Sequence, residues 1–373
     1  MKMCYHPWTG LHIDPQQGIM PCCKYSHIVS HDIKEYFSSD EVRELRESFT
    51  RGEQPAGCKN CWDDEAAGNA SKRELDWEYV YEHRVPELDS LKVLVTSFGN
   101  TCNLACRTCF SSDSSRWQPE AVKLQRHFPE FPVYKHNTFY RNAEYQAELR
   151  ELITDLEYLD LNGGEPFLAD ADIHLALLDH LIEHNAKNIR LRYITNTTVF
   201  PSEEFWSRWD KFKSVDISMS IDGVGKHFEY IRWPANWDTC YTNIKRYQEN
   251  MAQLPNGQLS ISHTVSLYNV FYLPEFVIWC IKERLPKPHL NTVYFPPEYR
   301  LNNLPKTVKQ AVTDKLSRFK NSDINSAVAT MSSPAEQPFD LTVNMIQALD
   351  QDRKQNFSTT FPEFYNIIKS QFA

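Results

Sequence analysis

The chain has 373 residues, of which 41% are hydrophobic and 24% are charged, and these are the proportions of a globular protein. A chain of this length can bury a sizeable core, which excludes the small scaffolds that depend on disulfides. Its 40 basic and 49 acidic side chains give a net charge of −9, which argues against a broad basic surface, so we do not expect nucleic acid as a partner.

The ten cysteines are clustered along the chain. No apolar run reaches the roughly 18 residues of a membrane span, and the first residues lack the apolar stretch of a signal peptide. We therefore expect a cytoplasmic protein without membrane contact, and in that reducing compartment clustered cysteines indicate metal binding. They form an N-terminal group, a second group and two isolated positions: Cys4, Cys22, Cys23, Cys58 and Cys61; Cys102, Cys106 and Cys109; Cys240 and Cys280.

Residues 1–75 are predicted to form a small cysteine-rich domain. They combine cysteines and turn-forming residues with one charged helical stretch, residues 40–50, and they show little continuous apolar pattern. We expect this segment to be stabilised by something other than a hydrophobic core. Residues 13–23 have the pattern of a hairpin that delivers a cysteine.

From residue 91 onward, short apolar strands alternate with helical segments, which is the pattern of repeated βα units. Residues 215–222 alternate strictly between apolar and polar side chains, and residues 259–265 do so similarly. Helices would cover the apolar face of such a sheet and leave a polar face toward a cavity, which predicts an α/β fold with an open barrel. The expected strands are residues 91–98, 156–161, 189–195, 215–222, 259–265 and 291–295.

The last part of the chain, residues 296–373, is predicted to be a mostly helical cap on the barrel. We expect a loop over residues 322–338 and a final helix over residues 362–372. The cap contains no cysteine and no cluster of catalytic residue types, so packing is its expected role.

Cys102, Cys106 and Cys109 follow the first expected strand closely enough for three thiolates to converge on one centre. A structural zinc ion usually takes four protein ligands, whereas three thiolates leave one position of a four-iron cluster open for an outside molecule. A zinc site that borrows a distant fourth ligand is the alternative.

This C-x3-C-x2-C loop, together with Gly163-Gly164-Glu165-Pro166 after a later strand, resembles the radical S-adenosylmethionine (SAM) superfamily. The resemblance covers residues 90–295 and implies a partial (β/α)6 barrel with a SAM-binding [4Fe-4S] cluster at the three cysteines. The two glycines would let the backbone approach the cofactor, and Glu165 would meet its ammonium group. A plain turn is the alternative for an isolated motif of this kind.

Two later positions resemble the places where this superfamily binds the ribose and the carboxylate of SAM. The resemblance implies cofactor binding by Asn196, Ser218, Ser220 and Asp222. Alternatively, each is a strand end with a solvated side chain. The sequence also departs from the family, because Thr108 occupies the position before the third cysteine where an aromatic residue is frequent.

The N-terminal cysteines resemble the ligands of the auxiliary-cluster modules called SPASM and twitch, displaced here to the N-terminus. The resemblance implies a second, fully ligated [4Fe-4S] cluster, and a zinc ion with the same ligands is the alternative. Two readings of the second ligand are open. The spacing from Cys4 through Gly18 matches the module when Cys23 is the ligand, whereas the Pro-Cys end of the module's hairpin matches Pro21-Cys22. We prefer Cys22. The implied ligands are Cys4, Cys22 or Cys23, Cys58 and Cys61.

The isolated cysteines are predicted separately. Cys280 lies in an apolar run and is expected in the core. Cys240 precedes an expected helix over residues 241–250. Because some radical epimerases of the superfamily use a lone thiol, Cys240 is a candidate hydrogen donor, with burial as the alternative. His263 falls with the apolar set of its strand, so core packing is expected.

The resemblance implies a radical SAM enzyme that reductively cleaves SAM to a 5′-deoxyadenosyl radical and abstracts hydrogen from its substrate. We expect oxidative modification or epimerisation of a peptide, protein or small metabolite, with an auxiliary cluster assisting. An electron donor such as flavodoxin or ferredoxin is the implied partner. The alternatives are modification of a nucleoside or sugar and, from another class, a non-catalytic zinc or iron–sulfur scaffold.

Overall fold

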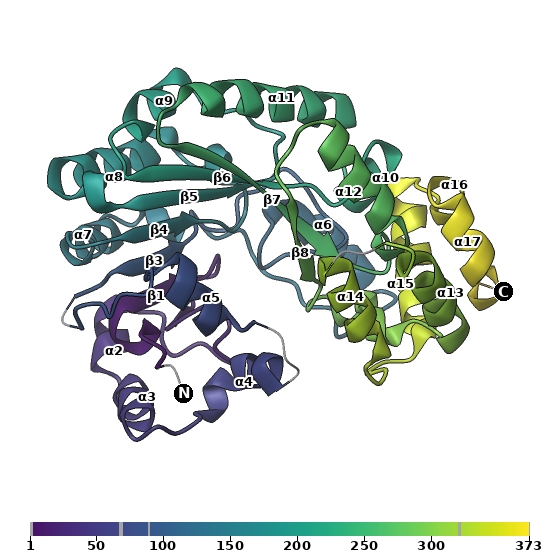
Figure 1. The fold of residues 1–373 in the computed structure, drawn as a ribbon, viewed down its shortest axis with the longest axis horizontal. Coiled ribbons are helices and arrows are strands. Elements are labelled where there is room, and N and C mark those ends of the chain that lie inside the picture. The colour runs from purple at the N-terminus through teal and green to yellow at the C-terminus, as the bar shows by residue number, and fades with distance from the viewer. Residues whose placement is uncertain (1–2, 67–69, 89, 320–321, 373) are drawn as a thin grey trace.

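The centre of the molecule is one mostly parallel β-sheet. The computed structural model describes residues 3–66, 70–88, 90–319 and 322–372. Within these residues the sheet has eight strands in the order β2-β1-β3-β4-β5-β6-β7-β8 (Figure 1). The six strands that form the partial barrel are β3 Val93–Thr96, β4 Tyr158–Leu161, β5 Arg190–Thr195, β6 Ser214–Ser220, β7 Gly257–Val265 and β8 Pro288–Thr292.

The α/β class and the partial barrel are confirmed. Each of the six expected strands is present and pairs in parallel with the next. Their ends differ from the expected ones: the first shortens to four residues, and the last begins at Pro288 rather than at residue 291. Strand ends depend on pairing with neighbours, which a local apolar pattern does not report.

Helices between the strands bury the apolar face of the sheet. In α8, Leu177, Leu178 and Leu181 are almost fully buried, and each contributes about 1.5–3 kcal/mol by leaving water. Asp170 occupies the position before α8 without capping it, because its carboxylate pairs with Arg141 Nε at 2.6 Å. The helices around the barrel are α6 Gln118–Leu124, α7 Ala143–Leu152, α8 Ala171–His184, α9 Glu203–Trp209, α10 Lys226–Ile231, α11 Trp237–Gln253 and α12 Leu273–Lys282.

The N-terminal segment extends the same sheet instead of forming an unsupported cysteine-rich unit. Strand β1 (Gly10–Ile13) pairs in parallel with β3, and β2 (Ile19–Met20) pairs with β1 as the expected hairpin. The expectation that this segment lacks a core is wrong, because Leu11, Ile13 and Ile19 belong to the main hydrophobic core. Its helices are α1 His6–Thr9, α2 Ile33–Ser38, α3 Asp40–Thr50, α4 Lys59–Ala66 and α5 Lys72–Tyr79.

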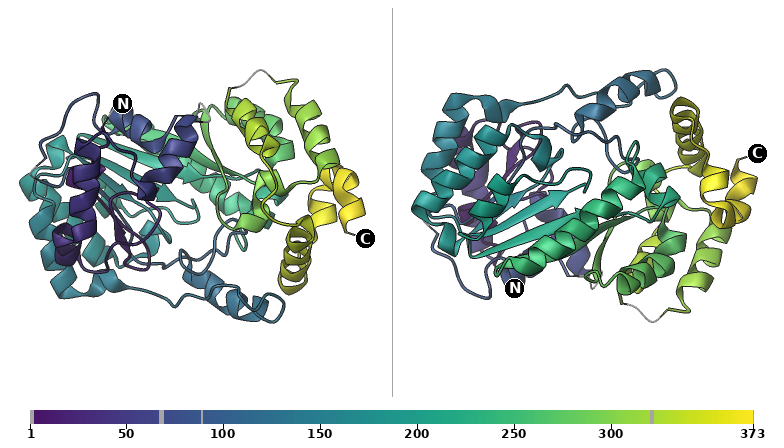
Figure 2. Two further views of the ribbon diagram at one scale, coloured as in Figure 1. Left: turned by 90° about the horizontal axis from the view of Figure 1, so that it is seen from below. Right: turned by 90° about the horizontal axis from the view of Figure 1, so that it is seen from above.

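The division into residues 1–75, 90–295 and 296–373 remains a prediction. Residues 1–2 and 67–69 of the first predicted domain lie outside the described residues. In both views of Figure 2 the C-terminal helices lie at one end of the molecule, and the N-terminal segment overlaps the half of the barrel that is farther from them.

The C-terminal cap is helical, and it has its own hydrophobic core. The loop expected over residues 322–338 is wrong for its first part, because α14 (Ser322–Ser332) buries Ile324, Ala327 and Met331 at helical spacing. The final helix is confirmed as α17 (Pro362–Ile368), and a 3-10 turn over Lys369–Gln371 follows it. The other helices of the cap are α13 Lys306–Leu316, α15 Phe339–Arg353 and α16 Phe357–Thr360.

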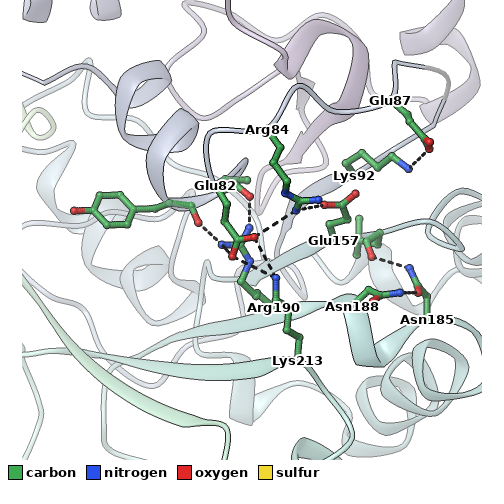
Figure 3. A network of polar contacts seen from close by, with 12 residues as sticks. Glu82, Arg84, Glu87, Lys92, Glu157, Asn185, Asn188, Arg190 and Lys213 are labelled. Carbon is green, nitrogen blue, oxygen red and sulfur yellow. Dashed lines mark hydrogen bonds and ion pairs between the residues drawn. The ribbon is translucent and has the colours of Figure 1, made fainter.

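A network of charged side chains ties the N-terminal segment to the amino ends of the barrel strands (Figure 3). Arg190 donates to the backbone carbonyls of Tyr79 and Val80, and Lys213 Nζ lies 3.2 Å from Glu82 Oε2. Glu82, Arg190 and Lys213 border a polar depression of about 510 Å³. It lies at the opposite end of the barrel from Cys102, because the cysteine loop follows the carboxyl end of β3.

None of the described helices is both long enough and apolar enough to cross a bilayer.

Candidate metal centres and cofactor site

The first cysteine loop follows β3 and gathers three partly buried thiols at the carboxyl end of the sheet. Burial, and then the charge of Cys106, raises the pKa of the Cys102 thiol to about 12. Burial, followed by Asp113 and the other two cysteines, raises the pKa of Cys109 well above its ordinary value. Three such thiols are deprotonated together only when a cationic centre compensates their charge, which is what an iron–sulfur cluster supplies. The donor set therefore fits the predicted cluster.

The described side chains offer no site for a single metal ion. Among the described residues, no three side chains of His, Cys, Asp or Glu lie close enough together to bind one ion. That finding concerns a single ion such as zinc, because a four-iron cluster holds its thiolate ligands farther apart than one ion does.

The backbone on both sides of Cys106 is fixed by the last residue of α10 and by the segment that follows it. The amide nitrogen of Ala105 donates to the carbonyl of Trp233 at 2.6 Å, and that of Arg107 donates to the carbonyl of Ile231 at 2.7 Å. The loop is thereby held in place before any cofactor binds, which reduces the entropy cost of ligation.

A buried cation lies beside the same thiol. Arg232 Nη1 is 4.0 Å from Cys106 Sγ, and Arg232 Nη2 is paired with Asp222 Oδ2 at 2.8 Å. Asp222 is fully buried, and its other oxygen accepts from the amide of Thr264 at 2.8 Å. Asp222 therefore holds the Arg232 side chain beside Cys106 of the cysteine loop. Ribose binding by Asp222 stays a prediction.

Gly163 and Gly164 follow β4, and Gly164 lies directly against Thr101, the residue before the cysteine loop. Both have left-handed backbone conformations, with φ of 69° and 58°. A Cβ atom on Gly164 would lie 2.5 Å from the carbonyl oxygen of Thr101, so no larger residue fits there without displacing the loop. The amide of Glu165 donates to that same carbonyl at 2.8 Å. The predicted cofactor motif and the predicted cluster loop thus share one contact.

Glu165 links the end of β4 to the end of β5. Its Oε1 accepts from Thr195 Oγ1 at 2.8 Å, and its Oε2 accepts from the amide of Asn196 at 2.7 Å. The side chain is 2% exposed, and burial raises the pKa of Glu165 to about 7 against the effect of these hydrogen bonds. Pro166 begins the 3-10 turn that follows. A buried, fixed carboxylate of this kind suits a cationic ligand group.

Asn196 completes the connection to the cluster loop. Its Nδ2 donates to Asn103 Oδ1 at 3.0 Å and lies 3.7 Å from Cys102 Sγ. The predicted residues from three consecutive strand ends therefore meet at one place.

A row of charged side chains on the inner face of the sheet was missed by the sequence analysis. Asp160 on β4, Arg192 on β5 and Asp216 on β6 share one register. Arg192 lies 3.3 Å from Asp160 Oδ2 and 3.2 Å from Asp216 Oδ2, and it donates to Ser218 Oγ at 3.1 Å. The available signal was that each of the three charged residues stands between two apolar residues of its strand. Ser220 is the next inward-facing residue toward the carboxyl end of β6.

Four of the N-terminal cysteines line one cavity. Cys23 is exposed and does not line it, so the structure favours Cys22 over Cys23 as the fourth thiol. The four lining thiols are those of Cys4, Cys22, Cys58 and Cys61.

Three cations line the same cavity, namely Lys24, Lys72 and Arg73. Lys72 is buried, which disfavours its charge, but Asp76 at 2.8 Å outweighs this effect and raises the pKa of Lys72 well above its ordinary value. Cations around four thiols suit a centre that carries net negative charge when the thiols ionise. The residues therefore fit the predicted auxiliary cluster.

The isolated cysteines lie within helices of the barrel. Cys280 on α12 is 1% exposed, which confirms the prediction that it lies in the core. His263 is also buried and donates from Nδ1 to the Ile221 carbonyl, which confirms its predicted core packing. Cys240 lies inside α11, so the expectation that it precedes the helix is wrong. It is fully buried, and the hydrogen-donor role stays a prediction.

Comparison with known families matches residues 92–229 to the model of a 4Fe-4S single cluster domain. The matched residues contain the cysteine loop, the glycine motif and the ends of β4, β5 and β6 that meet it. Over these residues the chain resembles a domain that holds a single 4Fe-4S cluster. The prediction of a [4Fe-4S] cluster in this part of the chain is confirmed by the family match.

Two solved structures resemble the chain at a distance. Native anSMEcpe with bound AdoMet and the Cp18Cys peptide is 14% identical, with a TM-score of 0.43, and the match covers 62% of this chain and 60% of that one. Streptococcus suis SuiB bound to S-adenosylmethionine is 16% identical, with a TM-score of 0.36, and the match covers 72% of this chain and 49% of that one. No curated protein sequence matches the chain.

Proposed function

We propose that the chain is an enzyme that cleaves SAM reductively and modifies a peptide or a small metabolite. Cys102, Cys106 and Cys109 would hold the SAM-binding [4Fe-4S] cluster. When bound, the cluster and SAM supply one-electron chemistry, in which SAM is split into methionine and a 5′-deoxyadenosyl radical that takes hydrogen from the substrate. The residues of this chain bind, orient and shield the reacting groups.

The observation that carries the proposal is the meeting of Glu165, Asn196 and Cys102. Glu165 accepts from the amide of Asn196 at 2.7 Å, and the Asn196 side chain lies 3.7 Å from the Cys102 sulfur. The carboxylate of Glu165, which can pair with an ammonium ion, is thereby connected through Asn196 to the thiol of Cys102, which can bind iron. SAM carries both an ammonium group and a carboxylate that can bind the open iron.

The charged row formed by Asp160, Arg192 and Asp216 supports a polar substrate. It lies on the inner face of the sheet, where a partial barrel holds its ligand, and the Arg192 side chain is 30% exposed. An oxidation or an epimerisation of a polar side chain is the reaction we propose there. The cytosol remains the proposed compartment, because the free thiols require reducing conditions.

We further propose that Cys4, Cys22, Cys58 and Cys61 bind an auxiliary [4Fe-4S] cluster. Four thiolates close such a site to outside ligands, which suits transfer of electrons rather than SAM binding. Lys72 supports this arrangement, because it lines the four-thiol cavity and its charge also acts on Asp160 of the inner face. Flavodoxin or ferredoxin is the proposed class of electron donor.

The test is the formation of 5′-deoxyadenosine by protein reconstituted with iron and sulfide without oxygen, supplied with SAM and dithionite. Cys102→Ala should abolish the product, and Cys4→Ala should largely retain it. Absence of the product from the unmodified chain would refute the proposal. Equal loss in both variants would refute the division of roles between the two cysteine groups.

A further inference from the structure

The C-terminal cap reaches the first cysteine loop through Asp350, Arg353 and Gln355, which we call the C-terminal clamp. Asp350 and Arg353 belong to the last turn of α15, and Gln355 follows that helix. Packing is the only role that the sequence of this cap predicts. Asp350 nevertheless contacts a residue 243 positions earlier in the chain, within the cysteine loop itself.

One arm of the C-terminal clamp holds Arg107, the residue after Cys106. The Arg107 side chain is fully buried, and its Nη2 donates to Asp350 Oδ1 at 2.5 Å and to Gln355 Oε1 at 3.0 Å. Its guanidinium also lies 3.8 Å from the centre of the Tyr230 ring. A fully buried positive charge requires such partners, so removal of Asp350 would leave Arg107 uncompensated.

Asp350 is itself held in place by two other elements. Its Oδ1 also accepts from Tyr230 Oη of α10 at 2.7 Å, and its Oδ2 accepts from the amide of Phe357, the first residue of α16, at 2.7 Å. The carboxylate therefore joins the cap, the barrel and the cysteine loop. Its orientation does not depend on Arg107 alone.

The second arm acts on the other side of Cys106. Arg353 Nη2 donates to the carbonyl of Ala105 at 2.8 Å, and the Arg353 guanidinium lies 4.8 Å from the centre of the Trp117 ring. Trp117 in turn donates from Nε1 to the carbonyl of Cys106 at 2.8 Å. The backbone of Ala105, Cys106 and Arg107 is thus constrained from the cap at both ends.

We propose that the C-terminal clamp positions the cysteine loop for its cluster, so that cluster binding at Cys102, Cys106 and Cys109 depends on Asp350. This inference rests on the proposed function, because it presupposes that the loop binds the SAM cluster. The three clamp side chains are positioning residues that act through Arg107 and Ala105. Helix α4 (Lys59–Ala66), which carries Cys61 of the auxiliary site, lies apart from α15 in Figure 1, and the proposal makes the auxiliary site independent of the clamp.

The test compares Asp350→Asn with Asp352→Asn, which changes an exposed aspartate of the same helix. Iron and sulfide are measured in the full chain after anaerobic reconstitution. A variant with Cys102, Cys106 and Cys109 all changed to Ala serves as the reference for a chain that binds only the auxiliary cluster. We expect Asp350→Asn to fall to the iron content of that reference, and Asp352→Asn to match the unmodified chain.

Electron paramagnetic resonance of the reduced protein gives a readout that general loss of stability would not move selectively. A cluster with an open iron changes its signal when SAM binds. We expect this change to be missing in Asp350→Asn and partly restored in Asp350→Glu, which keeps the charge. Gln355→Leu removes one acceptor of Arg107 but keeps the ion pair, and it should lose the iron of the first cluster to a chelator faster than the unmodified chain.

Full iron content and a SAM-dependent signal in Asp350→Asn would overturn the proposal. Loss of both clusters would also overturn it, because this result would assign Asp350 to general folding. If the unmodified chain binds no iron that depends on Cys102, Cys106 and Cys109, the proposed function itself fails and the clamp fails with it. The reference variant distinguishes this case from the others.

Discussion

Glu165 shows at the scale of one residue how burial and ligand binding oppose each other. Its carboxylate is almost fully buried, and burial raises the pKa of Glu165 from 4.5 to about 7. The ionised form is therefore costly in the free protein near neutral pH. A cationic group at this position would remove much of that cost, so binding and ionisation are coupled.

The first prediction concerns the pH dependence of stability. Because the pKa of Glu165 in the folded chain lies above its unfolded value, the stability contributed by its protonated form is present below about pH 4.5 and is lost as the pH rises toward about 7. The loss amounts to about 3 kcal/mol. Glu165→Gln should remove this part of the pH dependence, as measured by urea unfolding between these pH values. Glu203→Gln, at an exposed position, should leave the profile as it is.

The same substitution tests the proposed role in SAM binding. Glu165→Gln keeps the shape but removes the charge that would bind the ammonium group, so we expect affinity for SAM to fall roughly 10- to 100-fold. Equilibrium dialysis of reconstituted protein measures this quantity. The unmodified chain should bind SAM more tightly at pH 8 than at pH 6, because the pKa of Glu165 is about 7. A pH-independent affinity would contradict the assignment.

Gly164 offers a third prediction at this scale. Gly164→Ala combines left-handed strain with a Cβ atom 2.5 Å from the Thr101 carbonyl. We expect a loss of about 2–4 kcal/mol of unfolding free energy and weaker retention of iron at the first cluster. Gly52→Ala is the matched control, because Gly52 also has a positive φ of 74° but no atom lies near its Cβ position. It should cost about 1 kcal/mol and leave iron retention unchanged.

The hairpin of β1 and β2 decides which neighbouring cysteine serves the auxiliary site. Cys22 lines the four-thiol cavity, whereas Cys23 is exposed. Cys22→Ala should therefore lose the iron of the auxiliary cluster, and Cys23→Ala should retain it. Iron content and the visible absorption of the reconstituted protein measure this difference. The opposite ranking of the two variants would show that Cys23 is the ligand.

Elements with a strong local pattern could be predicted from the sequence, and elements defined by distant contacts could not. The alternation of β6 and the helical spacing in α8 identified both elements correctly. Strand β1 has only four residues and gains its place by pairing with β3, more than 80 residues later. Helix α14 was missed because Ser, Asn and Thr separate its buried positions and resemble the composition of a loop.

The candidate site divides in the same way. The cysteines and the glycine motif were predictable because each is a local motif with a known chemical use. The row formed by Asp160, Arg192 and Asp216 depends on the register of three strands, which the sequence does not state. The contact of Arg107 with Asp350 joins residues 243 positions apart, so no local pattern indicates it.

At the scale of the whole molecule, the N-terminal segment and the barrel share one hydrophobic core. This predicts how the segment exchanges hydrogen when iron is removed. If the segment depended on its metal alone, removal of iron would unfold it. Leu11 and Ile13 are buried in the main core, so β1 should remain protected from hydrogen exchange in iron-free protein. Residues 58–61 should lose protection under the same conditions. Uniform exchange over residues 3–66 would contradict this prediction.

The ion pair between Arg107 and Asp350 also orders events during synthesis of the chain. Arg107 leaves the ribosome long before its partner, because 243 positions separate them. Until α15 has emerged, the guanidinium has no carboxylate to meet and the loop around Cys106 lacks its constraint from the cap. If the C-terminal clamp is needed for cluster binding, as we propose, iron and sulfide can be delivered to this loop only after α15 has been made, and a chain truncated before α15 should bind no cluster there.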